Sequence, residues 1–134
     1  MAVVGRSILT LSALVLAVLG LTTLFAPDEL VRSLQPEASP TIAAALQVAG
    51  SGLLGFAILD WMSRGTRIGG IYARPLAIGN LVLFTVGTLS IIKAALAERL
   101  PAAGLILGAV FLALATAFAW LAFSHDPLKT SGSE

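Results

Sequence analysis

Four long apolar stretches constrain the fold of this chain more than any other feature. They cover residues 7–26, 42–62, 72–97 and 100–124 approximately, and the few charged residues in them lie near their ends. A helix rises about 1.5 Å per residue, so about 20 apolar residues cross a hydrocarbon core about 30 Å thick. The stretches are continuously apolar and do not alternate with period two, which favours helices over barrel strands. We therefore predict an all-α integral membrane protein with four spans.

Composition agrees with a membrane protein and excludes several functions. Of the 134 residues, 57% are hydrophobic and 11% are charged, which is outside the range of soluble domains. The net charge of +1 provides no basic patch for nucleic acid, and the absence of cysteine excludes disulfides and thiolate metal sites. We expect one membrane domain over residues 1–126 and a polar, disordered tail over 127–134. The first span is longer than a cleaved signal and has Leu24 where a small residue is required, so we expect it to be retained.

The distribution of Lys and Arg predicts how the chain is threaded. With a cytoplasmic amino terminus, the inner side carries five basic residues and the outer side three, as the positive-inside rule favours. The inner set is Arg6, Arg64, Arg67, Arg74 and Lys129, and the outer set is Arg32, Lys93 and Arg99. With this threading, one side of the membrane carries an interfacial belt of three aromatic residues, namely Trp61, Tyr72 and Trp120. This predicts an up-down-up-down four-helix bundle with both termini on the cytoplasmic side.

The connection after the first span contains a second helical signal. Pro27 is expected to close the first helix, and Leu30, Val31 and Leu34 then share one helical face. Segment 28–34 is therefore predicted to be a short helix on the outer membrane surface. Residues 98–100 are too few for more than a tight turn between the last two spans.

Two pairs of small residues have the spacing that lets membrane helices approach closely. Ser51 and Gly55 lie four residues apart in the second span, and Gly104 and Gly108 have the same spacing in the fourth. Lipid tails are as apolar as leucine, so close packing over small residues must help to hold such helices together. These residues either pack within one bundle or form a face for dimerisation or for a partner.

Asp60 is the one acidic residue inside an apolar stretch, and its position near the end of the second span suggests a boundary. It precedes Trp61 and lies four residues before Arg64, the spacing at which two helical side chains meet. We expect an interfacial ion pair between Asp60 and Arg64 in headgroup water.

Four other polar residues lie within the spans, namely Gln47, Asn80, Ser90 and Lys93. Asn80 can form an interhelical hydrogen bond, and Lys93 is close enough to a helix end to extend to the headgroups. Alternatively, these four residues, Gln47, Asn80, Ser90 and Lys93, line a polar pocket in which Lys93 recruits an anion.

No catalytic, cofactor-binding or metal-binding residue can be assigned from the sequence. The one histidine, His125, follows the last span, so paired haem ligation is excluded, and no phosphate-binding loop occurs. No intramembrane serine has an evident base within reach. Catalysis is therefore not favoured.

Size, four spans, the segment LFAPDEL and the glycine-rich run QVAGSGLLGFAILDW before an arginine-bearing loop resemble the DoxX-like group of small bacterial four-helix membrane proteins. The resemblance implies location in the bacterial inner (plasma) membrane, and some members are accessory subunits in quinone-linked oxidation. We expect a non-catalytic accessory, assembly or scaffold subunit that contacts lipid and a membrane protein partner or a second copy. The alternatives are a small-molecule or lipid carrier with an intramembrane pocket, and a quinone-linked enzyme subunit.

Overall fold

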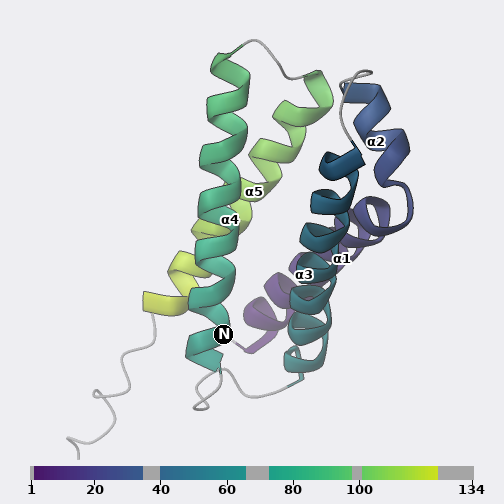
Figure 1. The fold of residues 1–134 in the computed structure, drawn as a ribbon. Coiled ribbons are helices and arrows are strands. Elements are labelled where there is room, and N and C mark those ends of the chain that lie inside the picture. Colours follow the sequence, from purple (N-terminus) through teal and green to yellow (C-terminus); the bar gives the residue numbers. More distant parts are fainter. Residues whose placement is uncertain (1, 35–39, 66–72, 98–100, 124–134) are drawn as a thin grey trace, which may run out of the picture. The chain divides into compact units, whose positions relative to one another are not determined.

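A computed structural model describes residues 2–34, 40–65, 73–97 and 101–123, and every regular element in these ranges is a helix. The helices are α1 (Ala2–Phe25), α2 (Pro27–Leu34), α3 (Pro40–Ser63), α4 (Ala73–Leu96) and α5 (Ala102–Phe123) (Figure 1). All but α2 are long and apolar enough to cross a membrane, which confirms the four predicted spans. The chain is a multi-pass membrane protein. Tyr72, the 98–100 turn and the 127–134 tail lie outside the described residues.

At two places, Arg6 and Pro27, the helices begin or end at residues other than those at which the apolar stretches do. α1 begins at Ala2, before the predicted start at residue 7, because the charge of Arg6 interrupts the apolar pattern but not the helix. α1 ends at Phe25, and Pro27 is the first residue of α2, a position where its missing N–H costs nothing. The predicted short helix is confirmed, with Asp28 and Glu29 in its first turn and Arg32 in its last.

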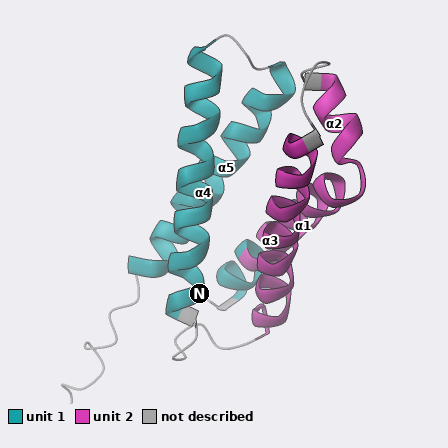
Figure 2. Ribbon diagram, in the orientation of Figure 1, with its two compact units in different colours: residues 1–8, 66–134 teal, residues 9–65 magenta. Residues whose placement is uncertain are grey.

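The chain divides into two compact units, one of residues 9–65 and one of residues 1–8 and 66–134 (Figure 2). In the first unit, α1 and α3 are in contact at three levels. Ser12 meets Asp60, Gly20 meets Gly50 and Leu54, and Gln47 reaches the Leu24 carbonyl oxygen. The contacts run in opposite order along the two helices, which is the pattern of an antiparallel pair. α2 packs on α3, with Pro27 and Val31 buried.

The second unit contains the α4–α5 pair, which packs through aromatic rings. Phe84 is fully buried, with its ring edge-on to Phe111 at a centroid distance of 5.1 Å and stacked on Phe118 at 5.8 Å. Gly87 faces the Phe111 ring and leaves the space that the ring occupies. These rings make up most of the large buried side chains of the pair.

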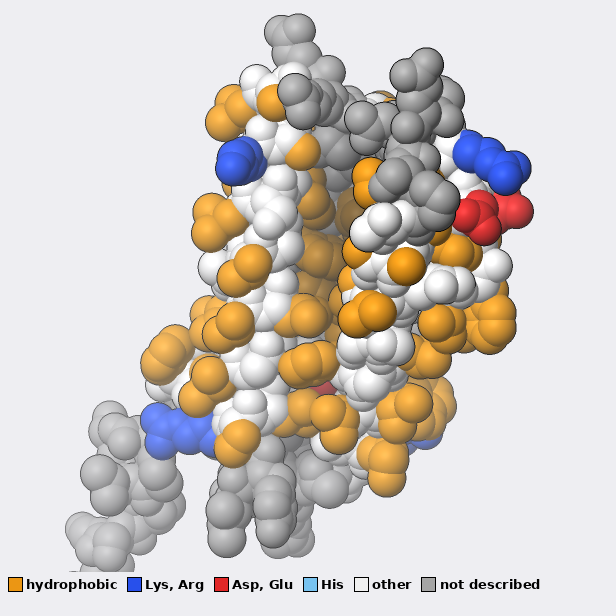
Figure 3. Space-filling view, in the orientation of Figure 1, with side chains coloured by type: hydrophobic (Ala, Val, Ile, Leu, Met, Phe, Trp, Pro, Cys, Tyr) orange, Lys and Arg blue, Asp and Glu red, His pale blue; other side chains and the backbone are white. Residues whose placement is uncertain are grey.

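Hydrophobic side chains are spread over the face of the molecule seen in Figure 3. Large hydrophobic residues are exposed on all four long helices, among them Val18, Val48, Val86 and Ile106. Exposed apolar surface of this extent suits hydrocarbon rather than water.

Candidate functional site

The polar centre of the α1–α3 pair is a hydrogen bond between Ser12 and Asp60. The Ser12 hydroxyl donates to a carboxylate oxygen of Asp60 at 2.5 Å, and both residues are 0% exposed. This distance is at the short end of the range for a hydrogen bond between two oxygen atoms. The bond therefore joins α1 to α3 and gives the fully buried carboxyl group a hydrogen-bond donor.

The depth of this pair follows from the two helices that carry it. Ser12 follows Arg6 by six residues in α1, which is about 9 Å of helix, and Asp60 precedes Arg64 by four residues, about 6 Å. Since Ser12 and Asp60 are bonded, they lie at one level, about 6 to 9 Å along the helices from these arginines. A carboxylate at this level is inside the apolar part of both spans.

Asp60 is fully buried, which differs from the position in headgroup water that we expected from the sequence. The carboxyl group of Asp60 meets Ser12, and the Arg64 guanidinium lies over the Trp61 ring, 3.2 Å from its centroid. The reason is that α1 presents a hydroxyl to the face of α3 that carries Asp60. The position of a residue along a span determines its depth in the membrane, but the neighbouring helix determines whether its side chain is buried.

The residues proposed to line a polar pocket are spread along their helices. Gln47 is exposed, and its amide nitrogen is 3.4 Å from the Leu24 carbonyl oxygen. In α4, Asn80 is buried and donates to the Leu76 carbonyl oxygen, whereas Ser90 and Lys93 are exposed. Thirteen residues separate Asn80 from Lys93, about 20 Å of helix, so these two cannot line one small pocket.

The glycines within the long helices divide into packed and open positions. A Cβ atom added at Gly20 would lie 2.9 Å from the Leu54 nitrogen, and one added at Gly50 would lie 3.0 Å from the Gly20 carbonyl oxygen. At Gly108 it would lie 2.9 Å from a methyl group of Ile91, so this glycine packs within the α4–α5 pair. Gly52 and Gly55 have nothing within 4 Å.

Gly52 and Gly55 belong to an outward strip of α3 that we call the open face. Its residues are exposed and recur at helical spacing on the side opposite buried Gly50, Ala57 and Asp60. The open face consists of Val48, Ser51, Gly52, Gly55, Leu59 and Met62. The Ser51 hydroxyl is bonded to the carbonyl oxygen of Val48 in the same helix. α3 has the smallest buried share of the four spans.

Sequence reasoning missed Ser12 and Gly20, and in the second span it selected Ser51 and Gly55 rather than the neighbouring Gly50. Gly20 carried a usable signal, because it is the one glycine in the leucine-rich stretch 7–26. Ser12 carried none, since Ser7 and three threonines occur in or beside the same helix and a hydroxyl can bond its own backbone there.

Searches against protein-family models, curated proteins and solved structures gave no match. Function therefore has to be argued from the geometry. Within the described ranges, no three His, Asp or Glu side chains come together as metal ligands.

Proposed function

We propose that this protein is a non-catalytic assembly subunit that binds another membrane protein through the open face of α3. The observation that carries the proposal is the contrast between packed and open glycines. Gly20, Gly50, Gly87 and Gly108 each admit a close neighbour, so intrachain packing accounts for them. Among the described residues, none packs against Gly52 or Gly55 in the same way.

A glycine that faces only lipid is unfavourable, because it weakens the helix by about 1 kcal/mol relative to alanine and offers lipid little surface. A glycine pair on an outward face is instead what a second helix requires for close backbone approach. Val48, Leu59 and Met62 flank the pair and supply apolar side chains for the same contact. The open face therefore has the composition of a membrane helix interface.

The proposal includes the threading and location that the sequence favours. These are an up-down-up-down bundle, both termini on the cytoplasmic side, and the bacterial inner membrane. The resemblance to the DoxX-like group supports the same role, since some of its members are accessory subunits in quinone-linked oxidation.

The direct test replaces both open glycines by leucine in tagged full-length protein. Gly52→Leu with Gly55→Leu is expected to leave the monomer folded, because both residues are exposed and a Cβ atom added at either one has no described atom of the chain within 4 Å. The variant should reduce assembly about tenfold or more, equivalent to 1.4 kcal/mol or more. Recovery of one stoichiometric partner, or of a differently tagged second copy, from native membranes measures the effect.

Ala113→Leu is the matched control, since Ala113 is an exposed small residue of α5. It should assemble like the unmodified protein. Gly108 is unsuitable for this test because it packs against Ile91, so a change there disturbs the α4–α5 pair itself. Equal assembly of the double-leucine variant and the control would refute the proposal.

A second candidate function, an intramembrane binding or transport site, is favoured by one specific observation. Asp60 is fully buried in a membrane span, and ionisable residues in that position commonly mark substrate or proton paths. Proteoliposomes with Asp60→Asn and with the unmodified protein distinguish the candidates. A proton flux that disappears only in the variant would favour transport, whereas no flux from either would favour assembly.

A further inference from the structure

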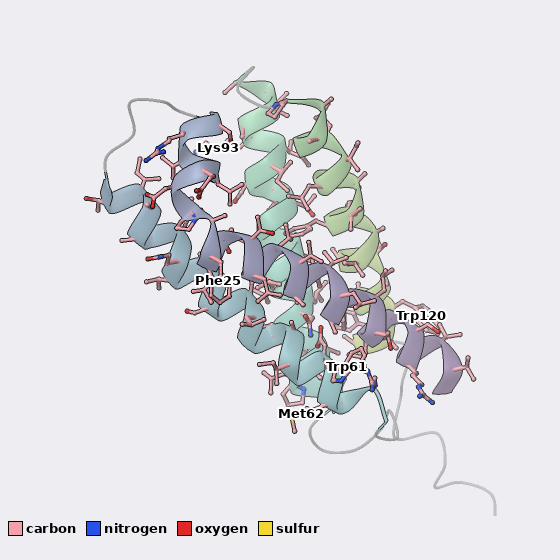
Figure 4. All side chains as sticks on the ribbon, turned by 90° about the vertical axis from the view of Figure 1, so that its right-hand side faces the viewer. Phe25, Trp61, Met62, Lys93 and Trp120 are labelled. Atoms are coloured by element: carbon pink, nitrogen blue, oxygen red, sulfur yellow. The ribbon has the colours of Figure 1, made fainter. Side chains whose placement is uncertain are left out.

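Arg64 and Trp61 form a stacked pair at the end of α3. The guanidinium carbon lies 3.2 Å from the centroid of the Trp61 ring, and Trp61 and Met62 occupy the last turn of the helix (Figure 4). The apolar span ends at Ser63, so Arg64 is the first residue beyond it. This is the level at which hydrocarbon gives way to lipid headgroups, where tryptophan is enriched.

The stacked geometry leaves Arg64 able to bind an anion. A guanidinium that lies on a ring through its face keeps its N–H donors in its own plane, pointing away from the ring centre. Those donors form the fork that pairs with two oxygens of a phosphate. Stacking also restricts the long side chain, so less conformational freedom is lost when an anion binds.

The composition of the sequence that follows Trp61 also suits an anion. Residues 64–74 contain three arginines, Arg64, Arg67 and Arg74, and no aspartate or glutamate. The nearest acid in the sequence, Asp60, is fully buried and accepts a hydrogen bond from Ser12. By contrast, residues 27–37 contain three acids and one arginine, Arg32.

We propose that the Trp61–Arg64 pair is a binding site for the phosphate of an anionic phospholipid headgroup. The indole lies at the headgroup boundary, the guanidinium receives the phosphate, and exposed Met62 beside them provides apolar surface for the upper part of an acyl chain. The site shares Met62 with the open face of α3, but Trp61 and Arg64 lie outside that face, so lipid binding can be tested independently of assembly.

The test compares full-length protein in nanodiscs of phosphatidylglycerol mixed with phosphatidylcholine. Native mass spectrometry of the protein released from the discs measures the phosphatidylglycerol retained. Arg64→Gln is expected to reduce retention about fivefold, the change expected when one arginine near an anionic surface is lost. Trp61→Leu should reduce it as well, and Trp61→Phe should restore part of the loss because a ring is kept.

Arg32→Gln is the matched control, as it removes one exposed arginine of α2 from the acid-rich connection. It should leave retention unchanged. Arg64→Lys separates a built site from general attraction, because lysine keeps the charge but lacks the planar fork. Retention equal to the unmodified protein in Arg64→Lys or in Arg64→Gln would overturn the proposal. So would displacement of the lipid by millimolar inorganic phosphate, since the headgroup would then not be the occupant.

Discussion

The α1–α3 pair and the α4–α5 pair use glycine in different ways. In α1–α3, Gly20 and Gly50 bring two backbones together, so the atoms nearest to an added Cβ include peptide nitrogen and oxygen. In α4–α5, Gly87 faces the side chain of Phe111, and the backbones are held apart by rings. The first pair also contains a buried polar bond, whereas aromatic contact dominates the second.

This difference shows what can replace the hydrophobic effect between helices in lipid. Two backbones that approach closely make many van der Waals contacts. These contacts cannot adjust to an added atom, because peptide atoms belong to rigid helices. Ring packing gains contact through side chains that can shift. The two pairs should therefore respond differently to the same substitution.

The largest expected effect comes from adding one methyl group at the backbone contact. Gly20→Ala should lower the free energy of unfolding by about 2 to 3 kcal/mol, because its Cβ would lie 2.9 Å from the Leu54 nitrogen. Gly87→Ala is the matched change in the other pair. It should cost less than half as much, since the Phe111 ring can turn aside, although the unrelaxed contact of 2.6 Å is shorter. Thermal unfolding in detergent compares them, and equal losses would remove the distinction between the pairs.

The next largest loss of stability is expected when the hydrogen bond between Ser12 and Asp60 is removed. Ser12→Ala should destabilise the protein by about 1.5 kcal/mol, because it removes a donor from a buried carboxylate. Ser7→Ala is the control, since the Ser7 hydroxyl is exposed and bonds the Val3 carbonyl oxygen of its own helix. A double-mutant cycle with Asp60→Asn measures the coupling. If Ser12→Ala and Ser7→Ala are equally mild, the bond does not stabilise the α1–α3 pair.

The smallest loss of stability is expected for a change in the aromatic contacts of Phe84 with Phe111 and Phe118. Phe118→Leu should cost about 1 kcal/mol, because it removes the stacked contact with Phe84 but retains most of the apolar volume. Phe123→Leu, at a position 74% exposed, should have no measurable effect. A loss at Phe118 larger than that at Ser12 would reverse the proposed ranking of the two pairs.

Much of the fold can be predicted from the sequence, because hydrocarbon thickness fixes the length of a span and charge marks its ends. The short helix at Pro27–Leu34 was also predictable, since proline and apolar spacing act locally. The site was not. Asp60 could be placed near the end of its span, but only the rotation of α1 determines that Ser12 faces it.

The glycines illustrate the same limit. The spacing of Ser51 and Gly55 predicted close packing, yet in the structure Gly50, one residue away, faces α1. Adjacent positions in a helix differ by about 100° of rotation. The small residues Gly50, Ser51, Gly52 and Gly55 therefore point to several sides of α3, and their spacing does not indicate which side has a neighbouring helix.

The Ser12–Asp60 bond has a consequence for biogenesis. An aspartate alone in hydrocarbon is unfavourable, by about 2.5 to 3.5 kcal/mol at the centre of a helix and by less one turn from its end, where Asp60 lies. Ser12 belongs to the first span, so it has already left the ribosome and can reside in the bilayer when Asp60 emerges. Synthesis from the amino terminus therefore delivers the hydroxyl before the acid that requires it, and exchanging the order of these two spans in a permuted gene would remove that help.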